Sequence, residues 1–176
     1  MRKIIKYFLL VVIFIFHTLL FAGINFVTPS YEITRISSGE VKRMDKDGFI
    51  TKSNPADSTV RDVYFINTQN PNKTEPKVYR NEDTGWGFPF YFKFDSANIQ
   101  AKALDYVSDT KLVELKYYGW RITMFSEFPN VTDIRLVEEN ETASHPILAY
   151  ILYILGLITL LLSVQLVRGW FDSEKA

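Results

Sequence analysis

Two long apolar runs, one near each end of the chain, constrain this sequence more than any other feature. The first extends from Tyr7 to Ile24, and its one ionisable side chain apart from Tyr7 is His17. The second extends from Pro146 to Val167 and carries no formal charge. At about 1.5 Å per residue these runs would form helices of about 27 Å and 33 Å, close to the hydrocarbon thickness of a bilayer. We therefore expect two transmembrane helices, which makes the lipid bilayer the first predicted partner.

The charges beside the two runs predict how the chain crosses the membrane. Residues 25–34 contain no Lys or Arg, whereas the outer flanks of the two runs carry Arg2, Lys3, Lys6 and Arg168. Because basic residues favour the cytoplasmic side, residues 1–6 and the tail 168–176 are expected in the cytoplasm. Residues 25–145 are then expected on the other side of the membrane.

The first run also has the basic start of a cleaved signal peptide. Signal cleavage prefers small residues at the first and third positions before the cut. Cuts before Gly23 or Ile24 would place Leu20 or Phe21 at the third position. The sequence therefore favours an uncleaved signal anchor over residues 7–24.

Residues 25–145 have the pattern of one mainly-β domain. Apolar residues at helical spacing predict a helix over 97–107, with Asp95 or Ser96 as its N-cap. Extended apolar and polar patterns predict strands over 32–44, 61–67, 77–80, 111–123 and 131–138. This order is that of an OB-like five-stranded barrel with one helix, and other small α+β folds share it. The expected fold class is thus two transmembrane α-helices that flank a mainly-β (α+β) extracytoplasmic domain.

An aromatic segment stands out within this domain. Residues 85–94 place an aromatic ring at every second position, namely at Trp86, Phe88, Phe90, Phe92 and Phe94. An extended chain would put all five rings on one face, and Pro89 restricts the segment to an edge strand or an extended loop. The favoured interpretation is a core strand, because something must cover five rings. A carbohydrate- or peptide-binding surface and an aromatic edge at the membrane interface remain open alternatives.

Composition excludes several kinds of chemistry. The chain has no Cys, its two His lie at positions 17 and 145, and its formal net charge is zero. We therefore expect no metal site, no cofactor, no nucleic-acid partner and no His-based catalytic triad. Asp83-Thr84-Gly85 matches the aspartic-protease triplet, but the apolar strand that should precede it is missing. The expectation is that the protein is not an enzyme.

Charged and aromatic residues concentrate at two places in the domain. The candidate partner- or ligand-binding residues are Arg80, Glu82, Asp83, Trp86, Phe88, Phe90, Trp120 and Arg121. Within the apolar runs, His17 is expected to hydrogen-bond a neighbouring helix, and Gln165 to reach the inner membrane interface.

Several segments resemble a known family. They are V-K-R-M-D (41–45), R-D-V-Y-F-I-N (61–67), the stretch 78–103 and Y-G-W-R-I (118–122). Together they resemble the bacterial and phage domain-of-unknown-function family 1523. The resemblance implies a bacterial or phage origin and hence a periplasmic location for residues 25–145. It assigns no activity and no functional residues.

These observations predict a non-catalytic interaction or structural protein of the bacterial inner membrane. It would present its periplasmic domain to a protein partner or to a second copy of itself. Two alternatives remain open: a membrane-tethered binder of a small molecule or glycan, and a hydrolase that uses Glu82, Asp83 or Asp95.

Overall fold

The computed structural model describes residues 1–45, 48–69, 76–108 and 111–172. The chain divides into two compact units. One unit contains Met1–Thr28 and Pro146–Ala176, and the other is Pro29–His145. Residues 173–176, the end of the predicted tail, lie outside the described residues.

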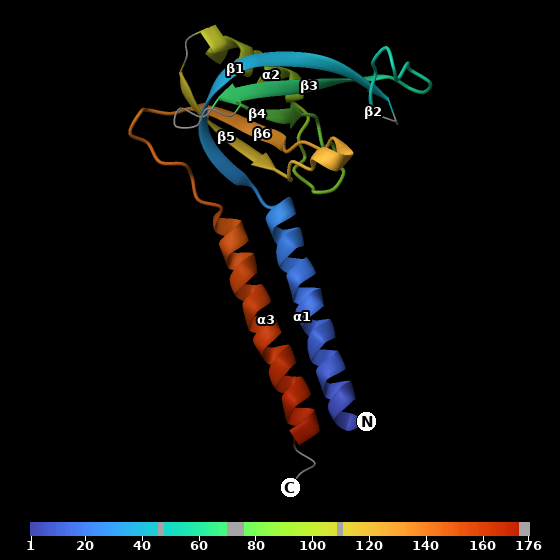
Figure 1. Cartoon of the computed structure of the whole chain (residues 1–176). Helices are drawn as coiled ribbons and strands as arrows, with labels where there is room; N and C mark the ends of the chain where they lie inside the picture. Colours follow the sequence, from blue (N-terminus) through green and yellow to red (C-terminus); the bar gives the residue numbers. More distant parts are fainter. Residues whose placement is uncertain (46–47, 70–75, 109–110, 173–176) are drawn as a thin grey trace. The chain divides into compact units, whose positions relative to one another are not determined.

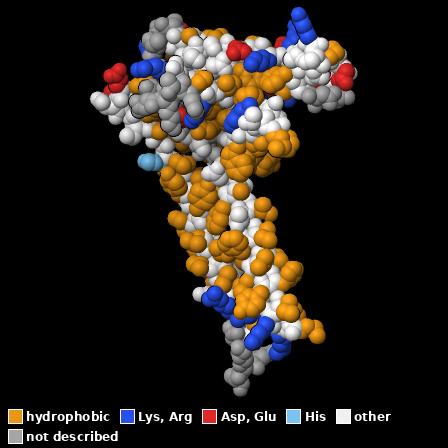
Figure 2. Space-filling model, viewed as in Figure 1, with side chains coloured by type: hydrophobic (Ala, Val, Ile, Leu, Met, Phe, Trp, Pro, Cys, Tyr) orange, Lys and Arg blue, Asp and Glu red, His pale blue; other side chains and the backbone are white. Residues whose placement is uncertain are grey.

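The first unit consists of two helices, α1 (Arg2–Val27) and α3 (Ile147–Asp172), both longer than the apolar runs (Figure 1). Helix α1 ends where Thr28 adopts an extended backbone, as residues before a proline prefer. Each helix is long and apolar enough to cross a membrane. Hydrophobic side chains cover the visible face of both, and Lys and Arg gather at one end of the pair (Figure 2).

The two helices pack against each other in antiparallel fashion. The ring of His17 is buried, and its Nε2 lies 3.3 Å from Thr159 Oγ1 on α3. Its Nδ1 lies 2.9 Å from the carbonyl oxygen of Ile13. A Cβ atom at Gly156 would lie 2.6 Å from the ring of Phe21, so this glycine lets the ring approach closely. Gln165 is exposed on α3.

The second unit is an α+β domain built on one six-stranded sheet. It contains helix α2 (Ser96–Ser108), the 3-10 turn η1 (Thr123–Phe125), and the strands β1 (Ser30–Asp45), β2 (Gly48–Phe49), β3 (Arg61–Gln69), β4 (Pro76–Asn81), β5 (Leu112–Tyr118) and β6 (Asn130–Leu136). Apolar helices at both ends of the chain thus flank a β-sheet domain.

Strand β1 is long enough to pair with two neighbours. Its residues 35–44 pair with β3, and its residues 30–35 pair with β5, both antiparallel. The strand order is β2-β1-β3-β4-β6-β5, and the β1–β5 pairing links the last strand back to β1. Strands β4 and β6 pair in parallel at Arg80 and Asn130.

The core lies between the sheet and helix α2. Its buried residues are Ile36, Ile66, Tyr79, Ile99, Ala103, Val113, Leu115, Val131 and Ile134. Ile99 and Ala103 form the buried stripe of α2. Gly39 of β1 lies close to this helix, because a Cβ there would be 2.7 Å from Gln100 Nε2.

Two predictions about the sheet are wrong. The strand expected over 111–123 ends at Tyr118, because Gly119 has a φ of +87° and turns the chain out of the sheet. Residues 85–94 form no strand, because Phe90 and Phe92 have φ values of +58° and +51°. The short β2 was not predicted from the sequence.

A charged groove and an exposed aromatic loop

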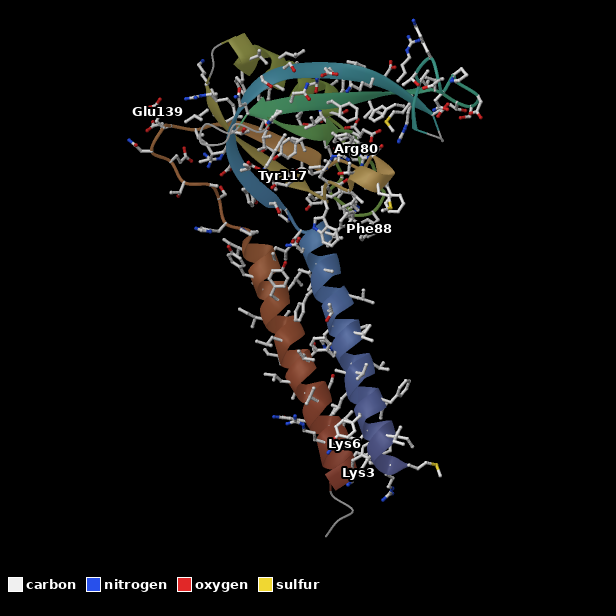
Figure 3. The ribbon with its side chains drawn as sticks, viewed as in Figure 1. Lys3, Lys6, Arg80, Phe88, Tyr117 and Glu139 are labelled. Carbon is white, nitrogen blue, oxygen red and sulfur yellow. The ribbon has the colours of Figure 1, made fainter. Side chains whose placement is uncertain are left out.

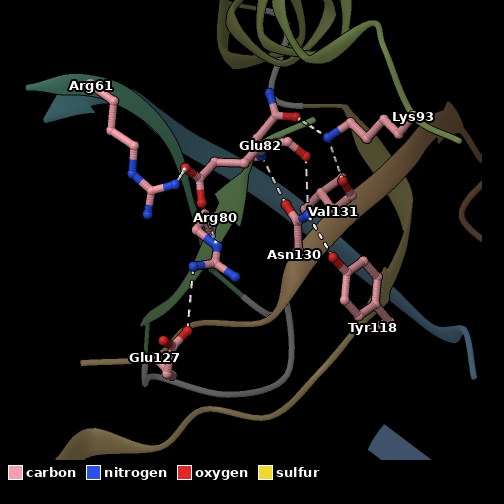
Figure 4. A network of polar contacts seen from close by, with 9 residues as sticks. Arg61, Arg80, Glu82, Lys93, Tyr118, Glu127, Asn130 and Val131 are labelled. Carbon is pink, nitrogen blue, oxygen red and sulfur yellow. Dashed lines mark hydrogen bonds and ion pairs between the residues drawn. The ribbon is translucent and has the colours of Figure 1, made fainter. Parts of the chain in front are cut away.

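The end of β4 and the start of β6 are joined by a side-chain amide (Figure 4). Asn130 Oδ1 accepts a hydrogen bond from the backbone N–H of Glu82 at 2.9 Å. Its Nδ2 donates to the Glu82 carbonyl at 3.0 Å and to the Tyr118 hydroxyl at 3.1 Å. The amide thereby takes the place of a strand neighbour just beyond the point where the β4–β6 pairing ends.

Ion pairs extend outward from this junction. Glu82 lies 3.1 Å from Arg61 Nη1 and 3.0 Å from Arg80 Nε, and Arg80 Nη1 lies 3.3 Å from Glu127. Arg80 Nε is buried and makes no hydrogen bond to any described residue, so its contact with Glu82 is an ion pair only. The side chains of Arg80 and Glu82 are 23% and 18% exposed, while those of Arg61 and Glu127 are mostly exposed.

Three of these four charged residues line an open groove of about 560 Å³. We call it the groove; its walls include Arg61, Arg80, Met124, Phe125, Glu127 and Phe128. The side chains of Met124 and Phe125 on η1 are 86% and 70% exposed. The rings of Phe65 and Phe128 pack edge to face with centroids 5.2 Å apart. The groove therefore combines paired charges with large apolar side chains that are exposed to solvent.

Arg121 supports the groove from the segment before η1. Its guanidinium lies 4.0 Å from the centre of the Phe128 ring, and its Nη1 donates to the Glu127 carbonyl at 2.8 Å. The side chain thus fixes the two residues that form one wall of the groove. Trp120, its neighbour in sequence, is 40% exposed.

Lys93 is buried beneath the junction and was missed by sequence reasoning. Its Nζ donates to Asn81 Oδ1 and, at 2.7 Å, to the carbonyl oxygen of Val131. Burial lowers the pKa of Lys93 to about 8, although the carboxylates of Asp83, Asp95 and Glu82 oppose this shift. A single Lys in an otherwise apolar segment was the available signal for this residue.

Residues 84–94, which we call the aromatic loop, are fixed by Lys93 and by backbone contacts. The Lys93 N–H donates to Thr84 Oγ1 at 3.1 Å, and the Gly85 N–H donates to the Lys93 carbonyl at 3.0 Å. The ring of Tyr91 stacks on that of Tyr118 with centroids 4.6 Å apart. Burial raises the pKa of the Tyr91 hydroxyl, and the neighbouring Tyr118 adds to the shift.

The other rings of the aromatic loop point outward, which overturns the core-strand interpretation. The exposed fractions of Trp86, Phe88, Phe90, Phe92 and Phe94 range from 53% to 78%. Figure 3 shows Phe88 at the periphery of the domain. The rings cover one another in part, with centroids 5.5 Å apart for the pairs Trp86–Phe92 and Trp86–Phe94. The segment therefore forms an exposed aromatic cluster on a loop.

Asp83 has a structural contact. Its Oδ1 accepts a hydrogen bond from the backbone N–H of Ser96 at 2.8 Å, at the first residue of α2. This is the kind of bond that a capping residue makes, although sequence reasoning expected the cap at Asp95 or Ser96. Among the described residues, no group of three or more His, Asp and Glu side chains is arranged to hold a metal ion.

The structure thus divides the predicted site residues other than Trp120 among three places. Arg80 and Glu82 line or border the groove, and Arg121 supports its wall. Trp86, Phe88 and Phe90 lie in the aromatic loop. Asp83 contacts the start of α2. Sequence reasoning missed Lys93 and Asn130, because their roles depend on strands that meet only in the fold.

Comparisons with known proteins agree with one another. A family model described as "Protein of unknown function (DUF1523)" matches residues 5–171. A protein of Haemophilus influenzae, described as an uncharacterized protein, is 58% identical over 175 residues, which cover 99% of this chain and all of that protein. No solved structure matches. Because the family model spans nearly the whole chain, the protein belongs to the DUF1523 family.

Proposed function

We propose that this protein is a bacterial inner-membrane protein that crosses the membrane twice and presents residues 29–145 to a protein partner on the periplasmic side. Both termini are then cytoplasmic. The length and apolarity of α1 and α3 support the two crossings. The basic side chains at one end of the helix pair support the orientation. The bacterial relative supports the type of host.

Both ends of the domain contact strand β5, which supports a domain held by two helices from one side. At its start, Ser30 pairs with Tyr117 of β5. At its end, the backbone N–H of Ser144 donates to the carboxylate of Glu114, also on β5, at 2.6 Å. Tyr117 and Glu114 are three positions apart, about 10 Å along a strand. The chain thus enters and leaves the domain at neighbouring places.

We also infer that the sheet is an OB-like barrel. Three observations support this. Strand β5, at the end of the sheet order, pairs back with β1; β4 and β6 pair in parallel; and α2 lies between β4 and β5 in sequence. In OB-folds the barrel is a scaffold that displays binding loops and a strand face. A binding role for the domain agrees with such a scaffold.

The observation that carries the binding proposal is the groove. Met124 and Phe125 expose large apolar side chains beside charges that already pair with one another. Such apolar anchors within a polar rim are typical of protein interfaces, where a few of them supply most of the binding energy. Because these charges already pair with one another, binding would bury the apolar side chains without leaving a buried charge unpaired.

Two of the three acidic groups that a hydrolase would use are engaged in structural contacts. Glu82 pairs with Arg61 and Arg80, and Asp83 accepts a hydrogen bond from Ser96. Both carboxylates therefore already have partners within the domain. These contacts favour a non-catalytic role. A small molecule or glycan bound in the groove is the second candidate, because its volume suits such a ligand.

Photo-cross-linking in intact cells tests the proposal. A photoreactive amino acid at Met124 should give a discrete protein adduct, and the same residue at the exposed Lys102 of α2 should give none. Phe125→Ser should weaken the adduct at Met124. The absence of any adduct from Met124, with the variant present in the membrane, would contradict a protein partner and leave the small-molecule candidate.

A further inference from the structure

The aromatic loop presents an apolar surface that is free of exposed charge. Its one charged side chain is Lys93, and that side chain is buried. The five outward rings, from Trp86 to Phe94, are each more than half exposed. Contiguous exposed apolar surface of this kind marks a contact with another protein or with a membrane.

The loop holds its rings outward by a defined backbone. The Gly87 N–H donates to the Thr84 carbonyl at 2.9 Å, and the Phe90 N–H donates to the Gly87 carbonyl at 2.8 Å. The buried Lys93 and the stacked Tyr91 attach the loop to the domain on its inner side. The backbone of the loop therefore holds the rings at the surface of the domain, without contacts from the hydrophobic core.

The register of the sheet places this loop at the end of the domain where the chain arrives from α1. Ser30, the first residue of β1, pairs with Tyr117. The next residue of β5, Tyr118, stacks on Tyr91 of the aromatic loop. Helix α1 ends at Val27 and β1 begins at Ser30, so only Thr28 and Pro29 lie between them, and the two ends are at most about 11 Å apart.

From this juxtaposition we infer that the aromatic loop docks into the lipid–water interface of the membrane that α1 and α3 cross. The inference rests on the proposed membrane crossing. Trp is enriched at this interface, and Trp and Phe together form the apolar face of segments that lie in it. A short connection to a membrane-spanning helix keeps the loop at a high effective concentration beside the lipid headgroups. A second protein copy is not tethered to the loop in this way, so phospholipid is the occupant that these observations favour.

Tryptophan quenching by lipid tests the inference on the full chain. Two variants keep a single tryptophan each: Trp120→Phe with Trp170→Phe leaves Trp86, and Trp86→Phe with Trp120→Phe leaves Trp170. Both are reconstituted in phosphatidylcholine vesicles, either plain or brominated near the top of the acyl chains. We expect Trp86 to emit at shorter wavelength than exposed tryptophan and to lose emission in brominated lipid about as strongly as Trp170. Adding Phe88→Ser with Phe90→Ser should diminish the loss at Trp86 and leave Trp170 unchanged.

Each other outcome overturns a stated part of the account. Emission of Trp86 that is unaffected by bromine, while that of Trp170 is quenched, refutes docking of the loop but keeps the membrane crossing. Short-wavelength emission of Trp86 without bromine quenching, together with a dimer in cross-linking, assigns the rings to a second copy. Absence of quenching at Trp170 as well refutes the membrane crossing itself.

Discussion

Replacing the buried Lys93 by Met should change how the stability of the domain depends on pH. Lys93 Nζ is held by Asn81 and by the Val131 carbonyl, and its side chain is 5% exposed. Burial lowers its pKa to about 8, against 10.5 for an ordinary Lys. Lys93→Met retains most of the aliphatic stem and removes the titrating group.

The size of the effect follows from proton linkage. Between pH 8 and pH 10.5 the unfolded chain keeps the Lys93 proton that the folded domain has released. The unfolded state then binds more protons, so the free energy of unfolding rises with pH. The whole pKa difference corresponds to about 3 kcal/mol, of which about 2 kcal/mol is gained between pH 7 and pH 9.5. Below the pKa that Lys93 has in the folded domain, its ammonium is charged and buried, and the free energy of unfolding is reduced by the full cost of that burial.

Urea unfolding of the full chain in mild detergent, followed by tryptophan fluorescence, measures this dependence. Measurements stop at pH 9.5 because tyrosines act in the opposite direction at higher pH. Burial raises the pKa of Tyr79 and Tyr91, so their deprotonation in the unfolded chain lowers stability as the pH passes about 10. Lys102→Met, at an exposed position of α2, serves as the matched control.

We expect the wild type and Lys102→Met to gain about 2 kcal/mol more than Lys93→Met between pH 7 and pH 9.5. The comparison between variants cancels the contribution of every other titrating group. If all three proteins show the same pH dependence, the reasoning that Lys93 is buried with a lowered pKa is refuted.

Three further perturbations test other parts of the structure by the same urea assay. Asn130→Ala breaks three hydrogen bonds and leaves backbone groups of Glu82 without partners, so it should cost about 2–4 kcal/mol, and a loss near zero would contradict the junction. Glu114 has a pKa below its usual value, because hydrogen bonds from Arg135 and Ser144 outweigh burial. The stability that Glu114 contributes should be full above about pH 4.3 and fall at lower pH. Glu114→Gln should make the free energy of unfolding depend less on pH in this acidic range, and an unchanged dependence would contradict the prediction. Phe88→Ser should change the free energy of unfolding by about 0.5 kcal/mol or less, since its ring is exposed, whereas Phe65→Ala should cost about 3–5 kcal/mol, and a comparable loss at both positions would return the aromatic loop to the core.

The sequence allowed most of the architecture to be predicted, because long apolar runs and strand alternation are local signals. The helix predicted over 97–107 is α2, and the strand predicted over 61–67 is β3. Strand pairing could not be derived in the same way. The bifurcated pairing of β1 with β3 and β5 depends on contacts between residues far apart in sequence.

The aromatic loop shows why burial was harder to predict than alternation. The period of two is present in the structure, since the rings at even positions are exposed while Tyr91 is half-buried and Lys93 is buried. The favoured interpretation from the sequence placed the rings in the core and assigned no place to Lys93. The structure reverses the two faces, because the Lys93 ammonium finds acceptors at Asn81 and Val131 and the Tyr91 ring stacks on Tyr118. Only the fold brings those acceptors together.

The ion pairs of the groove show the same limit. Arg80 and Glu82 are two positions apart in one segment, and their side chains lie 3.0 Å apart. Arg61 reaches Glu82 from the neighbouring strand β3. Glu127 joins them from a segment far along the chain.

Membrane topology is the central claim, and cysteine labelling measures it most directly. The chain has no Cys, so single cysteines give a clean background. One variant carries Thr59→Cys, at an exposed position of the domain, and another carries a cysteine added after Ala176. In intact bacterial cells with a permeable outer membrane, an inner-membrane-impermeant maleimide should label the cysteine at position 59 and leave the C-terminal one unlabelled until the cells are lysed. Labelling of the C-terminal cysteine in intact cells, or protection of position 59, would contradict a twice-crossing protein with its domain outside the cytoplasm.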